Sequence, residues 1–434
     1  MNAFSTGEAS ARAMPRPEGL DHSLEFLADP YRFISRHCRA LGTDVMQVTL
    51  MLQPTICITG ARAAELFYDR ERLIRTDAVP VNLISTLFGD QAVQGLDGDA
   101  HLQRRQFFLN ALTPARVRGL VDEAERVWNF MAPEWQAERE LCLYTASQQW
   151  LARTACNWAG VPLPAEDLRS RSRQLASLFD GAASGPLAHM KARRARRSLE
   201  DWLTGLIRAQ RNRSQVFLPG TLAEGAAWLT DLNGAPLAPR VAAAELINVL
   251  RPTVAVAVYV VHLAHALHQY PGAGLALVNC EGDETTENAD AFVHEVRRFY
   301  PFFPAVAARV RQGFTWQGFC FAAGRRVLLD LYGTNHDPRL WADPDTFQPQ
   351  RFIRRMPGPF ELIPQGGGDA IESHRCPGEG ATLSLMRLAL QLLTAGMRYS
   401  VPQQDLTLEM DRLPALPKSR FMLADFEQTA PEPA

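Results

Sequence analysis

The sequence carries no excess of charge, no metal-binding cysteine pattern and no composition typical of a disordered chain. Its 434 residues include 47 acidic and 45 basic side chains, and a net charge of −2 gives no general attraction to nucleic acid. The seven cysteines show no Cys-x-x-Cys spacing, which excludes a zinc or disulfide framework. Because 47% of the residues are hydrophobic, we expect a globular protein with a substantial core.

Long hydrophobic runs are also lacking. The most apolar stretch, residues 253–267, is shorter than the roughly 20 residues that span a bilayer, and it contains His262 and His265. We interpret it as a buried core helix. Residues 1–20 hold no apolar run, so we expect neither a secretory signal nor an anchor, and we predict a cytoplasmic protein without integral membrane association.

Apolar residues recur at helical spacing over most of the chain. Helices are predicted at 29–41, 61–68, 100–112, 114–136, 140–158, 166–180, 187–211, 222–230, 239–269, 287–299 and 378–397. Strands are predicted at 44–51, at 54–59, within 305–330, at 398–401 and at 421–424. The segment 69–99 is irregular and is predicted to be a long functional loop. No repeat or linker divides the chain, so we predict a flexible N-terminus (1–22), one large, mainly helical domain with a minor β-sheet region (23–427) and a flexible tail (428–434).

The sharpest local feature is a glycine-rich segment that delivers a cysteine to the start of a long helix. It reads Pro364-Gln-Gly-Gly-Gly and, six residues later, His374-Arg-Cys376-Pro-Gly-Glu-Gly380. The positive end of the helix dipole and free backbone N–H groups favour a thiolate there, so Cys376 is a candidate ligand or nucleophile. A small apolar cysteine after a turn is the simpler alternative. The glycines lack a following Gly-Lys-Ser/Thr, so they do not form a phosphate-binding loop.

Two segments ahead of this loop offer charged side chains that can pair. Glu295-Val-Arg-Arg298 places a carboxylate and a guanidinium at i and i+3 of one helix, although such pairs are common on solvated helices. Pro349-Gln-Arg351-Phe352 offers a second guanidinium to Glu295. In this order, the two segments and the Cys376 loop resemble the cytochrome P-450 haem-thiolate superfamily, over about residues 29–424.

The resemblance implies a cytochrome P-450-type helical domain that binds haem b. Cys376 would be the axial ligand of the iron, and the three charged residues Glu295, Arg298 and Arg351 would brace the core beneath it. His101-Leu-Gln-Arg-Arg105 resembles the His-x-x-x-Arg motif that binds the haem propionates in this superfamily. An ordinary exposed histidine is the alternative for His101.

Two further residues are implied by the same resemblance to contact a haem propionate. One is His374, two residues before the cysteine, and the other is Arg75.

The long apolar helix departs from the superfamily pattern. Most members have an acid and an alcohol there that relay protons, whereas this chain has Asn248-Val-Leu-Arg251-Pro252-Thr253. Pro252 removes an amide donor, so we expect the helix to kink. Burying the Arg251 cation unpaired would cost several kcal/mol, so we expect an anion beside it. That anion is either a protein carboxylate such as Glu245 or a substrate carboxylate, unless Arg251 extends to solvent.

Leu-Arg-Pro in this helix, together with the Cys376 loop, resembles the bacterial fatty-acid peroxygenase branch of the superfamily. By this resemblance Arg251 binds the carboxylate of a fatty acid, and hydrogen peroxide is the oxidant, so no redox partner is expected. The bound carboxylate would act as the general acid and base that the polypeptide lacks.

The loop before the His101 helix places a residue near the substrate's β-carbon in that branch. A histidine there accompanies decarboxylation to terminal alkenes, and a glutamine accompanies hydroxylation. This chain offers Gln94, with Phe88 nearby, so we predict mainly α- and β-hydroxy acids. Gln94 could equally be an amide that caps the loop.

Three alternatives remain open from the sequence. They are a reductase-dependent cytochrome P-450 monooxygenase, a fatty-acid decarboxylase and a non-catalytic haem sensor.

Two weaker patterns in the sequence are interpreted without a functional site. The basic run 191–197 is expected to form a solvated helix face, and the histidines at 262, 265 and 268 are expected to pack rather than bind metal.

Overall fold

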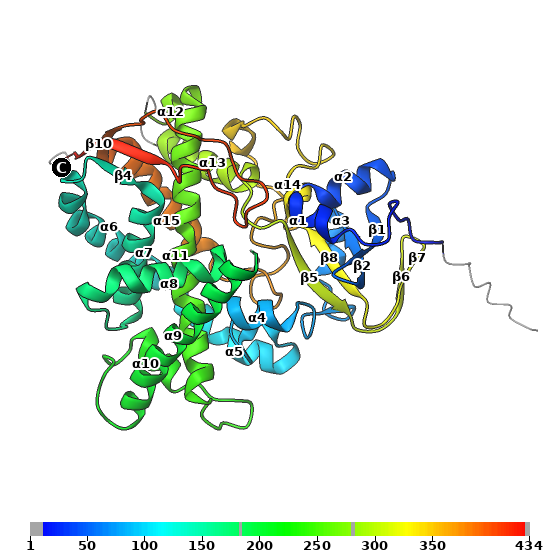
Figure 1. The fold of residues 1–434 in the computed structure, drawn as a ribbon, viewed down its shortest axis with the longest axis horizontal. Coiled ribbons are helices and arrows are strands. Elements are labelled where there is room, and N and C mark those ends of the chain that lie inside the picture. Colours follow the sequence, from blue (N-terminus) through cyan, green and yellow to red (C-terminus); the bar gives the residue numbers. More distant parts are fainter. Residues whose placement is uncertain (1–11, 182–184, 279–282, 430–434) are drawn as a thin grey trace, which may run out of the picture.

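The computed structural model describes residues 12–181, 185–278 and 283–429, so parts of the predicted flexible ends (1–11 and 430–434) lie outside the described residues. The elements of the N-terminal part are α1 (Ser23–Ala28), α2 (Phe33–Ala40), β1 (Val45–Leu50), β2 (Gln53–Ile58), α3 (Ala61–Phe67), β3 (Leu73–Ile74), α4 (Val81–Leu87) and the 3₁₀ turn η1 (Val93–Gly95). Figure 1 shows this sheet-containing part beside a larger helical part.

The middle of the chain is almost entirely helical. Its elements are α5 (Gly98–Ala111), α6 (Pro114–Gln136), β4 (Glu140–Cys142), α7 (Leu143–Ala159), η2 (Ala165–Asp167), α8 (Leu168–Asp180), α9 (Pro186–Arg211), α10 (Leu222–Ala227), α11 (Pro239–Gln269), α12 (Pro271–Val278) and α13 (Asp283–Phe299). Prolines begin α6, α9 and α11, where the missing N–H costs no hydrogen bond.

The C-terminal part returns to the sheets. Its elements are β5 (Ala305–Val310), β6 (Phe314–Trp316), β7 (Phe319–Phe321), β8 (Arg326–Asp330), α14 (Leu331–Asn335), η3 (Pro349–Phe352), α15 (Glu379–Gln391), the π-helical turn η4 (Leu392–Gly396), β9 (Met397–Ser400) and β10 (Met422–Gln428). The largest sheet has the strand order β1-β2-β8-β5-β3, so it joins strands from both ends of the chain.

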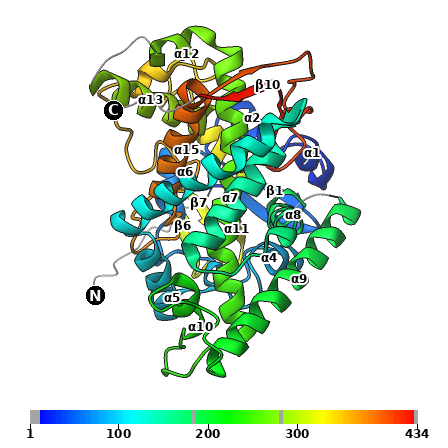
Figure 2. The same ribbon diagram turned by 90° about the vertical axis from the view of Figure 1, so that its left-hand side faces the viewer.

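Helix α11 is the centre of the core. It packs against α7, α8, α9 and α15, and Figure 2 shows it passing between them. Its length and apolar composition would suit a membrane span, but 94% of its most apolar window is buried inside the protein. The helix runs without interruption through Pro252. The predicted buried core helix is therefore confirmed, and the mainly helical fold with small sheets agrees with the prediction.

Several predicted elements were wrong in extent. The segment 69–99 is not a continuous loop, because it contains β3, α4 and η1. Helix α12 was not predicted, and 140–142 form a strand that pairs with β10 rather than the start of a helix. The basic run on α9 is also not uniformly solvated, because Arg196 is buried and pairs with Glu200. His262 and His265 pack in the core, and the ring of each is hydrogen-bonded to a backbone carbonyl oxygen.

Candidate active site

A cavity of about 330 Å³ lies between α11, the α4–α5 segment and the loop that leads to α15. It is largely apolar, and it is lined by side chains such as Phe108 and Val256. Cys376 lines it on the side of the glycine-rich loop, and Arg251 lines it from α11. The sequence motifs on these two segments, 125 residues apart in the chain, thus share one cavity.

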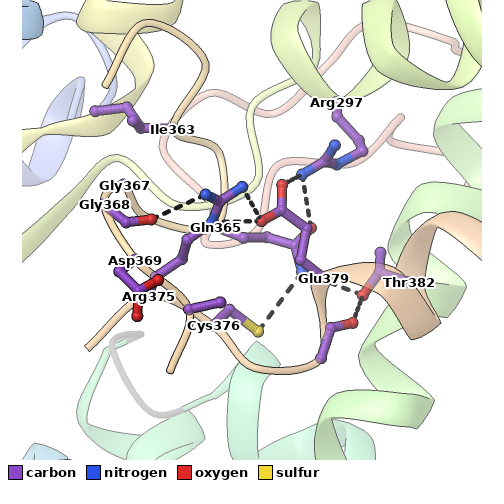
Figure 3. Close-up of polar contacts among 12 residues, drawn as sticks. Arg297, Ile363, Gln365, Gly367, Gly368, Asp369, Arg375, Cys376, Glu379 and Thr382 are labelled. Carbon is purple, nitrogen blue, oxygen red and sulfur yellow. Dashed lines mark hydrogen bonds and ion pairs between the residues drawn. The ribbon is translucent and has the colours of Figure 1, made fainter. Parts of the chain in front are cut away.

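The glycine-rich loop turns sharply to present Cys376. Gly366 has φ of +96°, and a Cβ there would lie 2.5 Å from the hydroxyl oxygen of Tyr68, so no other residue fits without displacement. The N–H of Cys376 donates to the carbonyl oxygen of Gln365 at 3.1 Å, and the Gln365 amide nitrogen lies 3.7 Å from the sulfur (Figure 3). Helix α15 begins three residues later, at Glu379.

The surroundings of Cys376 act on the pKa of its thiol in opposite directions. Burial raises the pKa of the thiol, although the Gly378 N–H and the Gln365 amide act in the opposite direction. The desolvation of the thiolate outweighs the donors that favour it. A metal cation bound at the sulfur would stabilise the thiolate.

A buried ion network lies beside the cysteine, and the sequence motifs did not assign it. Glu379 accepts hydrogen bonds from Arg297 and from Arg375, the latter at 2.7 Å (Figure 3). Arg297 also donates to the side-chain oxygen of Gln365 at 3.1 Å. The signal was present in the sequence, since Arg297 precedes Arg298 and Glu379 belongs to the cysteine motif. Only the fold shows that they meet.

Glu295, Arg298 and Arg351 are brought together by α13 and η3. Arg298 makes a two-pronged contact with Glu295 at 2.7 and 2.8 Å, and Arg351 Nε lies 3.2 Å from the same carboxylate. Glu295 and Arg298 are fully buried, and Arg298 also donates to the carbonyl oxygens of Asn335 and Pro344. This cluster joins α13 to the segment ahead of the cysteine loop.

Basic side chains lie near one edge of the cavity. The rings of His101 and His374 stack with centroids 4.0 Å apart, and both line the cavity. His374 Nε2 lies 3.4 Å from an Asp97 oxygen, and burial lowers the pKa of His101 to about 3. Arg105 also lines the cavity, but its Nε donates to the carbonyl oxygens of Ala370 at 3.1 Å and Ile371 at 3.0 Å.

Arg75 is placed differently from these residues. Its guanidinium lies over the Phe67 ring, 4.1 Å from the centroid, and donates to the carbonyl oxygen of Ala307. It does not line the cavity.

The donor set near Cys376 fits an iron porphyrin. Among the described residues, no group of three or more His, Cys, Asp or Glu side chains could hold a bare metal ion. A metal bound by Cys376 alone must therefore bring its other ligands with it, as the iron of haem does. The two carboxylates of haem would find basic side chains at the cavity edge in His101, Arg105 and His374.

Arg251 on α11 is a buried cation without an ion-pair or hydrogen-bond partner in the part of the chain that the structure describes. It is 6% exposed, and within the described residues it has no ion pair or hydrogen bond; its Nε is buried and unsatisfied. The Cζ atom of Arg251 lies over the Phe88 ring, 5.2 Å from the ring centroid. Burial and the nearby Arg196 lower the pKa of Arg251 to about 9.

The protein carboxylate considered for Arg251 is engaged elsewhere. Glu245 lies 2.6 Å from Arg104 and also accepts the Val93 N–H at 3.0 Å. Arg251 therefore neither pairs with Glu245 nor extends to solvent.

Gln94, Phe88 and Pro252 all line the same cavity. The side-chain oxygen of Gln94 accepts a hydrogen bond from Asn248 at 3.3 Å, so the amide is tied to α11 as well as facing the cavity. Gln94 thus lines the cavity while its side-chain oxygen is hydrogen-bonded to α11, and its position near the substrate's β-carbon stays a prediction.

Comparisons with known proteins agree with this architecture. Residues 287–423 match the family model "Cytochrome P450". Among curated proteins, Cytochrome P450 71D18 from Mentha gracilis is 33% identical over 128 residues, which are 28% of this chain and 25% of that protein. The match thus spans only about a quarter of that relative.

Solved structures match over almost the whole chain. Cytochrome P450SP alpha (CYP152B1) in complex with (R)-ibuprophen is 47% identical, with a TM-score of 0.91, over 94% of this chain and 99% of that chain. Cytochrome P450EX alpha (CYP152N1) with myristic acid is 38% identical, with a TM-score of 0.92, over 96% of this chain and 100% of that one. A variant of OleT in complex with arachidonic acid is 29% identical, with a TM-score of 0.92, over 97% and 100%.

The fold, with a cysteine presented to a cavity that a long core helix also lines, defines a haem-thiolate protein. The chain belongs to the cytochrome P-450 family, and its likeness to the CYP152 structures places it in the fatty-acid peroxygenase branch.

Proposed function

We propose that this protein is a haem-thiolate peroxygenase that uses hydrogen peroxide to hydroxylate fatty acids at the α- and β-carbons. One observation carries the proposal: the Arg251 guanidinium is buried, has no ion pair with any residue that the structure describes, and lines the same cavity as Cys376. An unpaired buried cation is costly, so the site is complete only with an anionic ligand. A fatty acid supplies both the anion and a chain suited to the apolar walls.

The residues that would hold haem b are Cys376 and the basic residues that line the same cavity. Cys376 would be the iron ligand, and His101, Arg105 and His374 would contact the propionates. Arg75 is a weaker candidate because its guanidinium already stacks on Phe67 and lies outside the cavity lining. When bound, the haem would supply the oxidising chemistry, with hydrogen peroxide giving the inserted oxygen and water leaving as the second product.

One cluster of charged side chains would support this site. Glu295, Arg298 and Arg351 would brace the core, since all three side chains meet in one buried cluster.

Arg251 would hold the substrate so that its carboxylate does the proton transfer. The guanidinium pairs with the carboxylate, and the carboxylate accepts a proton from hydrogen peroxide and returns it as water forms. Gln94, Phe88 and Pro252 line the space beside Arg251 and would contact the first carbons of the chain. Because hydrogen peroxide already carries the two electrons that a reductase would otherwise deliver to oxygen, no electron-donor protein is required. A cytoplasmic location belongs to the same proposal.

The test is a reaction of the haem-loaded protein with myristic acid and hydrogen peroxide, without any electron donor. We expect α- and β-hydroxy acids from the natural protein and none from Arg251→Ala, with the visible spectrum of the iron-bound protein unchanged. Arg194→Ala, which removes an exposed arginine of α9, is the matched control and should retain the activity. Product formation that requires a reductase would instead indicate a conventional monooxygenase.

A further inference from the structure

The carbonyl oxygen of Phe88 is held by two buried side chains from different helices. Arg196 on α9 donates from Nη2 to this oxygen at 2.9 Å, and Asn248 on α11 donates from Nδ2 at 2.9 Å. Arg196 is 3% exposed and Asn248 is 4% exposed. We call these two hydrogen bonds the Phe88 clamp. Since the Phe88 ring lies against Arg251, the clamp fixes the segment of chain that packs on the proposed substrate anchor.

Arg196 has its own counter-ion, in contrast to Arg251. Its Nε lies 2.6 Å from a Glu200 oxygen, and the other oxygen of Glu200 lies 2.8 Å from Arg240. Because Glu200 balances the charge, Arg196 does not need an anion, although its Nη1 has no hydrogen-bond partner among the described residues. The second edge of its guanidinium is free to bind the Phe88 carbonyl. The two buried arginines therefore have different roles: Arg251 is left to bind an anion, and Arg196 binds the carbonyl oxygen of Phe88.

Gly89 allows the loop to approach Arg196 this closely. Its φ is +94°, and a Cβ at this position would lie 2.0 Å from Arg196 Nη2 and 2.9 Å from the Cβ of Ala244. Any side chain there would collide with the clamp, in a backbone conformation that already favours glycine. Glycine at position 89 therefore leaves the space that Arg196 needs to bind the Phe88 carbonyl oxygen.

Asn248 extends the clamp to Gln94. Its Nδ2 also lies 3.3 Å from the Gln94 side-chain oxygen and 3.4 Å from a Glu245 oxygen. Three acceptors on one side fix the orientation of the amide, because a flipped amide would turn its oxygen toward all of them. One side chain therefore ties together Phe88 and Gln94, which both line the cavity beside Arg251.

We propose that Arg196 and Asn248 are positioning residues that set which carbon of the fatty acid is hydroxylated. This inference rests on the proposed function and deepens it. The carboxylate of the substrate binds where Arg251 and the Phe88 ring leave room for it. The α- and β-carbons are joined by a single bond, so a small displacement of that position changes which of them reacts. A loosened clamp frees the Phe88 segment and thereby weakens both binding and regioselectivity.

The experiment compares haem-loaded Arg196→Met with Arg197→Met. Methionine preserves much of the apolar stem but removes the donors, and Arg197 is an exposed neighbour on the same helix. Three quantities are measured: hydrogen–deuterium exchange of the backbone over 81–95, the dissociation constant of myristic acid from the change in visible absorption, and the ratio of α- to β-hydroxy acid. In Arg196→Met we expect faster exchange over 81–95, a dissociation constant raised about tenfold and a changed product ratio. Arg197→Met should resemble the natural protein in all three, and Arg196→Lys, which retains a donor, should recover part of the loss.

A second pair of variants tests the Phe88 clamp at Gly89 rather than at Arg196. Gly89→Ala places a methyl group on Arg196, whereas Gly234→Ala introduces the same change at a φ of +79° with nothing within 4 Å. We expect Gly89→Ala to reproduce the Arg196→Met results and Gly234→Ala to leave them unchanged. The double variant Gly89→Ala/Arg196→Met should lose less than the sum of the two single losses, because both variants break the Phe88 clamp.

Two results would overturn the inference. Unchanged exchange over 81–95 in Arg196→Met would show that the clamp does not hold the loop. Faster exchange with an unchanged dissociation constant and product ratio would show that the clamp is structural only. A natural protein that binds myristic acid but gives no product with hydrogen peroxide would refute the proposed function and the regioselectivity role, while exchange and binding would still decide whether the clamp positions the ligand.

Discussion

Glu245 is a fully buried carboxylate that depends on a single cation. Arg104 Nη1 lies 2.6 Å from it, and the Val93 N–H and the Asn248 amide are its other donors. Arg104→Met removes the cation while preserving an apolar stem of similar length. Leaving one charge of a buried pair uncompensated costs about 3–5 kcal/mol, so we expect a loss of stability of that size above neutral pH.

The loss should depend on pH, with a sign that follows from the pKa. Burial already raises the pKa of Glu245, and removing Arg104 raises it further. An acid whose folded-state pKa is raised loses stability as the pH rises from its unfolded value through its folded value. The destabilisation of Arg104→Met should therefore be larger at about pH 8 than at about pH 5.5, by up to about 1.4 kcal/mol for each unit of additional pKa shift.

Urea unfolding of the haem-loaded protein at both pH values measures this effect. Arg126→Met is the control, because its pair with Glu123 is solvent-exposed and should contribute little. Arg104→Met/Glu245→Gln, which removes the charge as well as its partner, should regain part of the stability. Equal unfolding midpoints for Arg104→Met and the natural protein would refute the reasoning, and with it the explanation of why Glu245 leaves Arg251 unpaired.

Three further outcomes are expected. Arg298→Ala leaves the buried Glu295 without its two-pronged partner and should lower the free energy of unfolding by about 3–5 kcal/mol, measured by thermal unfolding. Burial holds the pKa of His262 at about 3, against an ordinary value of 6.5, so stability should fall as the pH drops below 6.5. His262→Gln should flatten that slope by up to about 1.4 kcal/mol per pH unit in unfolding series between neutral pH and about pH 4.5. Gln94→His should raise the share of terminal alkene among the products of myristic acid, which gas chromatography quantifies.

The sequence was most informative where local pattern and packing agree. Helix α11 was predicted with its observed bounds, because Pro239 marks its start and its apolar residues continue almost unbroken. Helix α4 was missed because seven residues with little periodicity do not form a stable helix on their own. Its end is held by Arg196, which is distant in the sequence, through the Phe88 carbonyl.

The ion pairs of the site also differ in whether the local sequence predicts them. Glu295 and Arg298 lie three residues apart, so their pairing could be predicted from helical spacing. The pairs Arg104–Glu245 and Arg297–Glu379 join residues separated by 141 and 82 positions. No local pattern encodes such contacts, so only the fold explains why Arg251 has no protein partner.

The most direct test of the account compares myristic acid with its methyl ester as substrates of the haem-loaded protein and hydrogen peroxide. The ester has the same chain but no ionisable carboxyl group, so it can neither pair with Arg251 nor accept a proton from the peroxide. We predict hydroxylation of the acid and essentially none of the ester. Hydroxylation of the ester at a rate similar to that of the acid would contradict the claim that the substrate's own carboxylate, held by Arg251, completes the active site.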